Sequence, residues 1–349
     1  MCSLFIVLFS LLASQNVVCK SVNNPNPIYL NNIYPVVLLH GITSDNTELT
    51  TVANWLMETL PNKVFNLEIG NGKIDSIFKT MDWQLNQLCY EIYSIPELSD
   101  GFHFIGMSQG GLLARGYVQR CNKYPVINLI TWVSPHAGVF GFNDVQFNFD
   151  KVYKPFYQNM YSFAGYWKDP FRYNLYLSSA SYLPYLNNEI NTTEINMFYD
   201  GNFNNYDDDD YNNYDDDYND YNENIKWSSE QNKANMLLLK NFVMIWSPND
   251  DVLSPPESGK FGFYDIISNA NGYNLMDHLD ILADFVVNEV ELPVKDFFES
   301  EQYTKDLLGL RTLYETGRLH ILETNCTHSG HKTEQCFPQL EKLTFPFLI

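Results

Sequence analysis

The chain has 349 residues, of which 45% are hydrophobic, and its formal net charge is −21. This length and apolar content allow one large domain or two ordinary ones with a sizeable core. The acidic balance argues against nucleic acid as a partner, because phosphates require a basic face.

The first residues predict a targeting segment. Residues 4–13 (LFIVLFSLLA) form an apolar run that is too short to span a bilayer, and small or polar residues follow it. We therefore expect a signal peptide over residues 1–19 and a linker over 20–32. The alternative is an N-terminal helix that stays buried or acts as an anchor. No second run of about 18 apolar residues follows, which predicts a mature chain without a transmembrane segment, in the secretory pathway.

From residue 33 onward, strand-like and helix-like segments alternate. Helices are expected over residues 74–93 and 112–121, and strands over residues 35–39, 64–69, 102–105, 126–133, 242–246 and 319–322. The continuous apolar runs at 35–39 and 126–133 fit strands that are buried on both faces. The order predicts an α/β fold with a mostly parallel central sheet flanked by helices, over residues 33–349.

The pattern changes between about residues 140 and 240. Aromatic residues are dense over 147–185 and predict several short helices, which we interpret as a mainly helical cap inserted before the next strand. Within it, residues 202–224 are rich in Asn, Asp and Tyr, and we expect this acidic segment to be disordered. It lacks the glycine turns and the regular ligand spacing of a calcium loop, so no metal site is predicted there.

Four cysteines lie beyond the targeting segment, an even number that fits an oxidising compartment. They are Cys89, Cys121, Cys326 and Cys336. Four cysteines allow three pairings; proximity favours Cys326–Cys336, and the predicted helices are compatible with Cys89–Cys121. Asn191 and Asn325 each begin an N-glycosylation acceptor sequence.

The strongest motif is residues 106–110 (GMSQG), which matches the nucleophile-elbow pattern G-x-S-x-G. In such an elbow, a sharp strand-to-helix turn holds the Ser108 hydroxyl out at the carboxyl edge of the sheet. The predicted strand at 102–105 and helix from 112 supply the required context. The backbone N–H of Gln109 is the expected first donor of an oxyanion hole, and residues 40–42 are expected to supply the second.

A serine nucleophile needs a base, and in this arrangement an acid and then a histidine follow it along the chain. Asp250 and Asp251 come directly after the strand at 242–246. His328 and His331 follow the last strand, whereas His320 lies within it. The pattern separates neither the two acids nor the two histidines after the strand.

Several segments resemble the palmitoyl-protein thioesterases. They are residues 35–45 (PVVLLHGITSD), 106–111 (GMSQGG), 119–140 (QRCNKYPVINLITWVSPHAGVF), 166–176 (YWKDPFRYNLY), 241–264 (NFVMIWSPNDDVLSPPESGKFGFY) and 303–319 (YTKDLLGLRTLYETGRL). The resemblance extends from about residue 35 to 328, interrupted mainly by the acidic segment. It is specific, because YW-x-DP, ND followed by a proline, and FGFY are not common to hydrolases at large.

This resemblance implies an α/β-hydrolase that cleaves the thioester between a long fatty acyl chain and a protein cysteine, usually in the lysosome. It matches Ser108 to the nucleophile, Asp250 to the acid and His328 to the base. It matches Ile42 and Gln109 to the oxyanion donors, and the Cys89–Cys121 spacing resembles a disulfide of the family. The residues after His328 depart from the family pattern.

The implied reaction needs no metal and no organic cofactor, and its substrates are S-palmitoylated proteins or peptides. A lipase or carboxylesterase that acts on oxygen esters is the nearest alternative, because the same residues support it. A catalytically silent acyl-binding protein is the alternative from another class.

Overall fold

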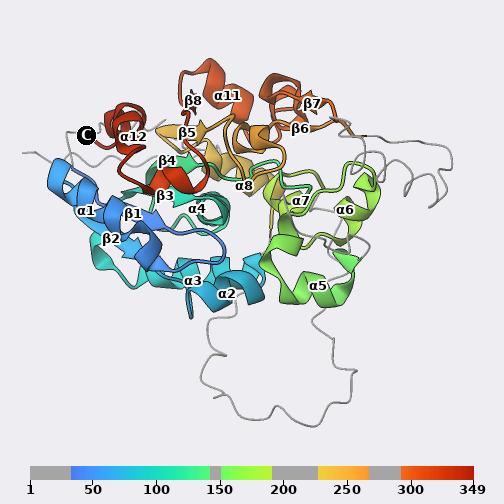
Figure 1. Ribbon diagram of the computed structural model, residues 1–349, viewed down its shortest axis with the longest axis horizontal. Helices are drawn as coiled ribbons and strands as arrows, with labels where there is room; N and C mark the ends of the chain where they lie inside the picture. Colours follow the sequence, from blue (N-terminus) through green and yellow to red (C-terminus); the bar gives the residue numbers. More distant parts are fainter. Residues whose placement is uncertain (1–32, 142–150, 191–226, 267–291) are drawn as a thin grey trace, which may run out of the picture. The chain divides into compact units, whose positions relative to one another are not determined.

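The computed structural model describes residues 33–141, 151–190, 227–266 and 292–349 (Figure 1). The described residues from 33 onward belong to one compact unit. The expected signal peptide and linker, the acidic segment at 202–224 and the acceptor Asn191 lie outside the described residues and stay predictions. Among the helices that the structure describes, none has both the length and the apolar character needed to cross a bilayer.

The centre of the compact unit is a six-stranded sheet with the order β2-β1-β3-β4-β5-β8. All neighbouring strands are parallel. The strands are β1 (Val36–Leu39), β2 (Val64–Leu67), β3 (Phe102–Met107), β4 (Val126–Trp132), β5 (Asn241–Trp246) and β8 (Leu319–Glu323). Every residue of β1, β3 and β4 is buried, as expected for strands covered on both faces. The predicted parallel α/β fold is confirmed.

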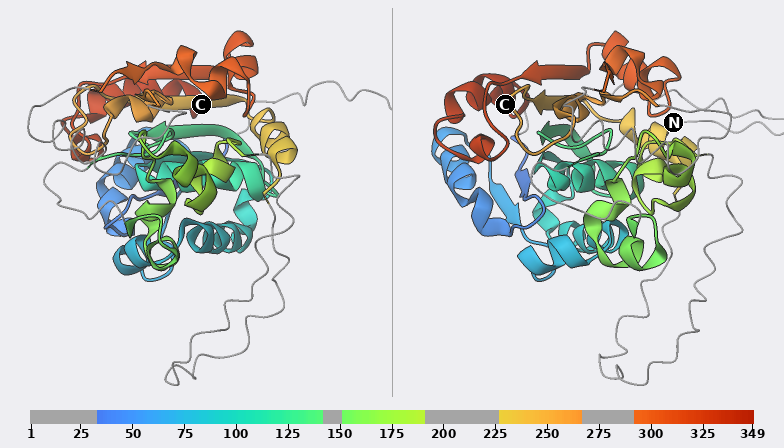
Figure 2. Two further views of the ribbon diagram at one scale, coloured as in Figure 1. Left: turned by 90° about the vertical axis from the view of Figure 1, so that its right-hand side faces the viewer. Right: turned by 45° about the vertical axis from the view of Figure 1, so that its right-hand side comes forward.

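Helices cover both faces of this sheet (Figures 1 and 2). One apolar core lies between the sheet and α3 (Met81–Tyr93), α4 (Gln109–Arg120) and α8 (Ser229–Met236). The opposite core includes side chains of α1 (Thr50–Thr59) and α12 (Phe337–Thr344). There the rings of Trp55 and Phe337 stack with centroids 4.3 Å apart, which joins the first and last helices of the unit.

The remaining elements are shorter. The helices are α2 (Lys73–Phe78), α5 (Pro155–Met160), α6 (Tyr173–Ser179), α7 (Leu183–Leu186), α10 (Glu301–Thr304) and α11 (Leu310–Glu315). A small antiparallel pair is formed by β6 (Phe263–Tyr264) and β7 (Val294–Lys295). The 3₁₀ turns are η1 (Asn46–Leu49), η2 (Pro96–Leu98), η4 (Ser162–Tyr166), η7 (Pro256–Lys260), η8 (Phe297–Glu299), η9 (Ser329–Lys332) and η10 (Phe345–Phe347).

The single helix expected over residues 74–93 is wrong, because the structure contains two helices there. α2 ends at Phe78 and α3 begins at Met81. Between them Thr80 is extended, and its side chain accepts a hydrogen bond from the backbone N–H of Trp83. This is an N-cap, which starts a new helix and turns the chain.

Among the described residues between β4 and β5, short helices separated by turns occur up to Leu186, as the aromatic-rich pattern predicts. α5, η4, α6 and α7 follow one another there. α8, at the end of the range expected for the cap, instead lies beside α4, where Asn235 donates to the carbonyl of Gln119 over 2.8 Å. Its apolar side chains belong to the core under the sheet. The role of 140–240 as a cap stays a prediction.

Two disulfides join the four described cysteines. Cys89 of α3 is bonded to Cys121 at the end of α4, with their Cα atoms 6.1 Å apart. Cys326, in the loop after β8, is bonded to Cys336 at the start of α12, also with 6.1 Å between Cα atoms. These are the two pairs expected from the sequence, and the second closes a short loop around residues 327–335.

Candidate active site

The nucleophile-elbow motif forms a sharp turn between β3 and α4. β3 ends at Met107, α4 begins at Gln109, and Ser108 between them has φ +53° and ψ −126°. A positive φ is costly for a residue with a Cβ, so the surrounding structure must hold it. The Ser108 side chain does not cap the helix, and within the described residues its hydroxyl makes no hydrogen bond. The hydroxyl therefore lies at the N-terminus of α4 but does not cap the helix.

Glycines are needed on both sides of this turn because the backbone passes so close. A Cβ added to Gly106 would lie 2.6 Å from the carbonyl oxygen of Gly110, and one added to Gly110 would lie 2.4 Å from that of His40. Real Cβ atoms do not approach backbone atoms so closely. The pattern G-x-S-x-G is thus a steric requirement of packing the elbow against the end of β1.

The elbow lies at the point where the direction of the strand order reverses. The chain passes from β1 to β2 on one side, then returns to β3 on the other side of β1. In open parallel sheets, ligands bind outside the carboxyl ends of the strands at such a switch point. Ile42 follows β1 and Ser108 follows β3, so both residues lie at the carboxyl edge of the sheet, at this switch point. A Cβ added to Gly41 would lie 3.1 Å from the Cβ of Ser108, so the loop after β1 passes in close contact with the elbow.

The expected acid and base meet at the ends of β5 and β8, which are neighbours in the sheet. Nδ1 of His328 lies 3.0 Å from Oδ1 and 2.8 Å from Oδ2 of Asp250. Both residues are buried, with 6% and 7% of their surface exposed. Oδ1 of Asp250 also accepts from the backbone N–H groups of Val252 and Leu253, each over 2.9 Å. The carboxylate is therefore held rigidly against one nitrogen of the ring.

The adjacent acid has a different task. Oδ1 of Asp251 accepts a hydrogen bond from the backbone N–H of His328 over 3.0 Å. It thus holds the main chain of the residue whose ring faces Asp250. The sequence pattern left these two acids unresolved, and the structure separates them by the atoms they bind.

The second candidate histidine is fully enclosed. His331 is 0% exposed, its Nδ1 lies 2.8 Å from the carbonyl oxygen of Thr327, and its Nε2 lies 2.8 Å from the hydroxyl of Thr324. Burial lowers its pKa below the ordinary value for histidine. Both ring nitrogens are used inside the loop after β8, so the ring has no nitrogen left for a substrate or a nucleophile.

The comparisons with known proteins decide the family. The family model of palmitoyl protein thioesterase matches residues 35–328. The chain belongs to the palmitoyl protein thioesterase family. It is 35% identical to palmitoyl-protein thioesterase 3 of Dictyostelium discoideum over 322 residues, which cover 90% of this chain and 92% of that protein. It is 28% identical to the lysosomal thioesterase PPT2 homolog of Drosophila melanogaster over 90% of this chain and 91% of that protein.

In this thioesterase-family chain, the side chain of Gln109 connects the elbow to three other elements, one of which is α3, where its Nε2 donates to Oε1 of Gln84 over 3.1 Å. The same Nε2 donates to the carbonyl oxygen of Ser76 in α2 over 2.9 Å, and Oε1 of Gln109 accepts from the hydroxyl of Tyr166 in η4 over 3.0 Å. The elbow motif identifies only the backbone N–H of this residue. No local pattern identifies the side-chain partners, because they lie 25, 33 and 57 residues away.

The other histidines of the described residues are built into the core or the sheet. Nδ1 of His103 accepts a hydrogen bond from Nδ2 of Asn128 over 3.1 Å, and burial lowers the pKa of this histidine to about 4. His136 lies 2.8 Å from the hydroxyl of Thr131, and burial lowers its pKa well below the usual range. His40 is buried beside the Ile42 loop, with its Nδ1 2.9 Å from the carbonyl oxygen of Gly41.

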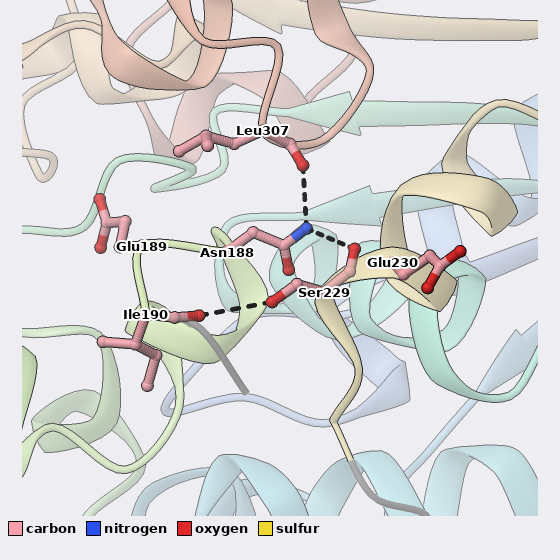
Figure 3. Close-up of a pocket in the computed structure, with 6 residues that line it drawn as sticks. All are labelled: Asn188, Glu189, Ile190, Ser229, Glu230 and Leu307. Atoms are coloured by element: carbon pink, nitrogen blue, oxygen red, sulfur yellow. Dashed lines mark hydrogen bonds between the residues drawn. The ribbon is translucent and has the colours of Figure 1, made fainter. Parts of the chain in front are cut away.

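A pocket of about 430 Å³ lies elsewhere in this family member (Figure 3). It is lined by Asn188, Glu189, Ile190, Ser229, Glu230 and Leu307. The Glu189 carboxylate is already bound by Lys168, Tyr176 and Gln302. Nδ2 of Asn188 donates to two carbonyl oxygens. This pocket contains none of the expected site residues, and its polar groups serve to join loops. Within the described ranges, no three His, Cys, Asp or Glu side chains are grouped as metal ligands would be.

Proposed function

We propose that this chain hydrolyses long-chain fatty acyl thioesters of S-acylated proteins or peptides, with Ser108, Asp250 and His328 as its triad. The observation that carries the proposal is the buried contact of the His328 ring with the Asp250 carboxylate, at the same carboxyl edge of the parallel sheet as the serine elbow. Membership of the palmitoyl protein thioesterase family supports the thioester rather than another acyl bond.

The protonation pattern follows from the Asp250 contact. A carboxylate within 3.0 Å of Nδ1 favours the tautomer in which Nδ1 carries the hydrogen. Nε2 of His328 is then the basic nitrogen and takes the proton of the Ser108 hydroxyl as the oxygen attacks the thioester carbonyl. Asp250 stabilises the charged ring that results, and its own position is fixed by two backbone N–H groups.

The oxyanion that forms needs preorganised donors. Gln109 is the first residue of α4, and the first N–H groups of a helix have no partner within it. Its N–H and that of Ile42, across the switch point, are the two donors in this proposal. The positive end of the helix favours the same negative charge.

Release of the thiol, in the first half of the reaction, requires less of the protein than release of an amine from an amide. A cysteine thiolate, whose thiol has a pKa near 8.5, leaves readily from the first tetrahedral intermediate, and it takes up the proton that His328 received from Ser108. In the second half, water attacks the acyl group on Ser108 while His328 takes the proton of that water, and the ring returns this proton to the Ser108 oxygen when the second intermediate collapses. The products are the free fatty acid and the protein thiol. Every step uses side-chain and backbone groups alone.

A lysosomal or other secretory-pathway location is part of this proposal. Two disulfides fit an oxidising compartment, and one relative is named a lysosomal thioesterase. The acceptor Asn325 is exposed in the loop after β8, which is compatible with glycosylation on that route.

The test is hydrolysis of a palmitoyl-cysteine thioester by purified protein, beside a palmitoyl oxygen ester of the same chain length. We expect turnover of the thioester, a preference over the ester, and loss of turnover in Ser108→Ala by about 10⁴-fold or more. Preference for the ester would assign a lipase or carboxylesterase. A folded chain that binds palmitate, turns over neither substrate and is not labelled by a serine-directed probe would be an acyl-binding protein.

A further inference from the structure

Two short helices beside the elbow expose apolar side chains in a regular pattern. On α2, Ile74 and Phe78 are 62% and 47% exposed; on α5, Phe156 and Met160 are 61% and 36% exposed. In each helix the two residues are four apart and therefore lie on one face. Short helices normally bury their apolar face, so exposure of both pairs calls for a partner.

The two helices are joined by contacts between aromatic rings. The rings of Phe78 and Tyr161, the residue that follows α5, have centroids 5.6 Å apart. Tyr161 in turn lies 5.6 Å from Tyr157 of α5. Figures 1 and 2 show α2 and α5 side by side at the same end of the compact unit. We call this surface the α2–α5 face, and define it by Ile74, Phe78, Phe156 and Met160 with the lysines named below.

The charges on the α2–α5 face are positive, although the chain as a whole carries −21. Lys79, Lys151 and Lys154 are exposed, and in the described part of the chain none of them forms an ion pair. By contrast, seven other lysines are ion-paired. Across residues 73–79 and 151–160 the only acid is Asp75, which is buried and accepts from the backbone N–H of Asn71. Asp45 and Glu68 lie beside Gly72, at the start of α2 and at the opposite end of that helix from Phe78 and Lys79.

We propose that the α2–α5 face docks on an anionic lipid surface and brings the elbow to membrane-bound substrate. Apolar and aromatic side chains that insert at the headgroup level, flanked by unpaired lysines, are the features by which proteins bind such a surface. An acidic protein would match the lysines alone and leave four apolar side chains without a role. The proposal extends the proposed function, because a long acyl chain on a protein is itself held in lipid.

The face is attached directly to the elbow. The carbonyl oxygen of Ser76 in α2 accepts hydrogen bonds from Gln109, the residue after Ser108, over 2.9 Å and from Ser162 of η4 over 2.7 Å. Tyr166 of η4 donates to the same Gln109 side chain. Docking through α2 and α5 would therefore place the carboxyl edge of the sheet next to the lipid headgroups.

Sedimentation with vesicles tests the proposal without any need for turnover. The Ser108→Ala chain is mixed with vesicles of phosphatidylcholine containing about one-third phosphatidylserine, or with pure phosphatidylcholine. We expect binding to the anionic vesicles that weakens as salt is added. The pair Phe78→Ser with Phe156→Ser, and the pair Lys79→Gln with Lys154→Gln, should each weaken it by about tenfold or more.

Matched controls lie on other surfaces. Tyr90 and Leu238 are 63% and 66% exposed, and Lys342 is exposed and not ion-paired within the described residues. Tyr90→Ser, Leu238→Ser and Lys342→Gln should leave vesicle binding within about twofold. Equal losses in the control and face variants, no binding by the parent chain, or binding only to acidic polypeptides would overturn the proposal.

A second readout separates this proposal from the proposed function. With Ser108 restored, the face variants should keep their turnover of a soluble short-chain thioester and lose turnover of a palmitoyl peptide embedded in anionic vesicles. Retained soluble turnover also demonstrates that these variants fold. If no thioester is cleaved by any variant, the proposed function fails, and the vesicle sedimentation still decides the docking face.

Discussion

Replacing His328 and His331 in turn separates the chemistry of the site from the stability of its loop. His328→Ala removes the only ring that contacts the Asp250 carboxylate among the described residues, at 2.8 Å from Nδ1 to Oδ2. In serine hydrolases, loss of the base lowers kcat by about 10⁴-fold to 10⁶-fold. We therefore expect no measurable hydrolysis of a palmitoyl-cysteine thioester by this variant.

His331→Ala should have the opposite profile. The ring is fully buried and makes two hydrogen bonds of 2.8 Å, to Thr327 and Thr324. Each bond contributes about 1 kcal/mol, and the Thr324 hydroxyl is left buried without this partner at a cost of about 1–3 kcal/mol. The free energy of unfolding should fall by about 2–4 kcal/mol. At a temperature where the variant stays folded, kcat should fall by less than about tenfold.

Both quantities can be measured on the same preparations. Urea unfolding gives the stability of each variant, and initial rates on the thioester give kcat and KM. His320→Ala is a matched control, since this histidine lies in β8 with its Nε2 3.0 Å from the side chain of Asn241, away from the Asp250 contact. A folded His331→Ala protein without turnover, together with an active His328→Ala protein, would refute the assignment of the base.

Three further predictions concern the two acids after β5, the elbow and a buried histidine of β3. Asp250→Asn should lower kcat by about 10⁴-fold with little loss of stability, whereas Asp251→Asn, which keeps an acceptor for the backbone N–H of His328, should lower it by less than about tenfold; initial rates distinguish the two. Gly110→Ala puts a Cβ 2.4 Å from the carbonyl oxygen of His40, so we expect the free energy of unfolding to fall by about 1–3 kcal/mol and turnover to fall as well. A variant with full stability and activity would contradict this steric explanation. Burial lowers the pKa of His103 to about 4, so between about pH 6.5 and pH 4 the unfolded chain binds a proton that the folded chain does not. The free energy of unfolding should therefore decrease as the pH is lowered through this range, by about 1.4 kcal/mol per pH unit from this residue. Urea unfolding of His103→Gln should show a correspondingly weaker dependence of stability on pH.

The sequence predicted the sheet because its strands carry their own signal. The apolar runs of β1 and β4 are buried along their whole length, and the order of strands and helices fits a parallel sheet. The break between α2 and α3 was missed for a physical reason. Ile77, Met81, Leu85 and Leu88 continue one helical spacing, which hides the cap that Thr80 forms with the N–H of Trp83. Hydrophobic periodicity indicates which residues of a helix face the core, and it does not detect a short extended segment between two helices.

Part of the candidate site could be predicted from the sequence, and part depends on tertiary contacts. The elbow is a local motif, so its glycines and serine could be placed from the sequence. The choice between Asp250 and Asp251, and between His328 and His331, depends on contacts that join residues 77 or 78 positions apart. Neighbouring residues on a loop point in different directions, and only the tertiary structure fixes which one faces the partner. The family spacing gave the same choice because it encodes that tertiary contact indirectly.

The histidine that competed with His328 in the sequence is better understood as part of what holds His328 in place. The loop after β8 is fixed at three points: the ring of His331 binds Thr324 and Thr327 within the loop, the disulfide joins Cys326 to α12, and Asp251 binds the N–H of His328 itself. A loop of this kind would otherwise be mobile, and an error of about 1 Å at the base is costly in catalysis. The family match ends at residue 328, so Asp250 and His328 lie within the matched residues, whereas the His331 and Cys336 contacts that anchor the loop lie beyond them.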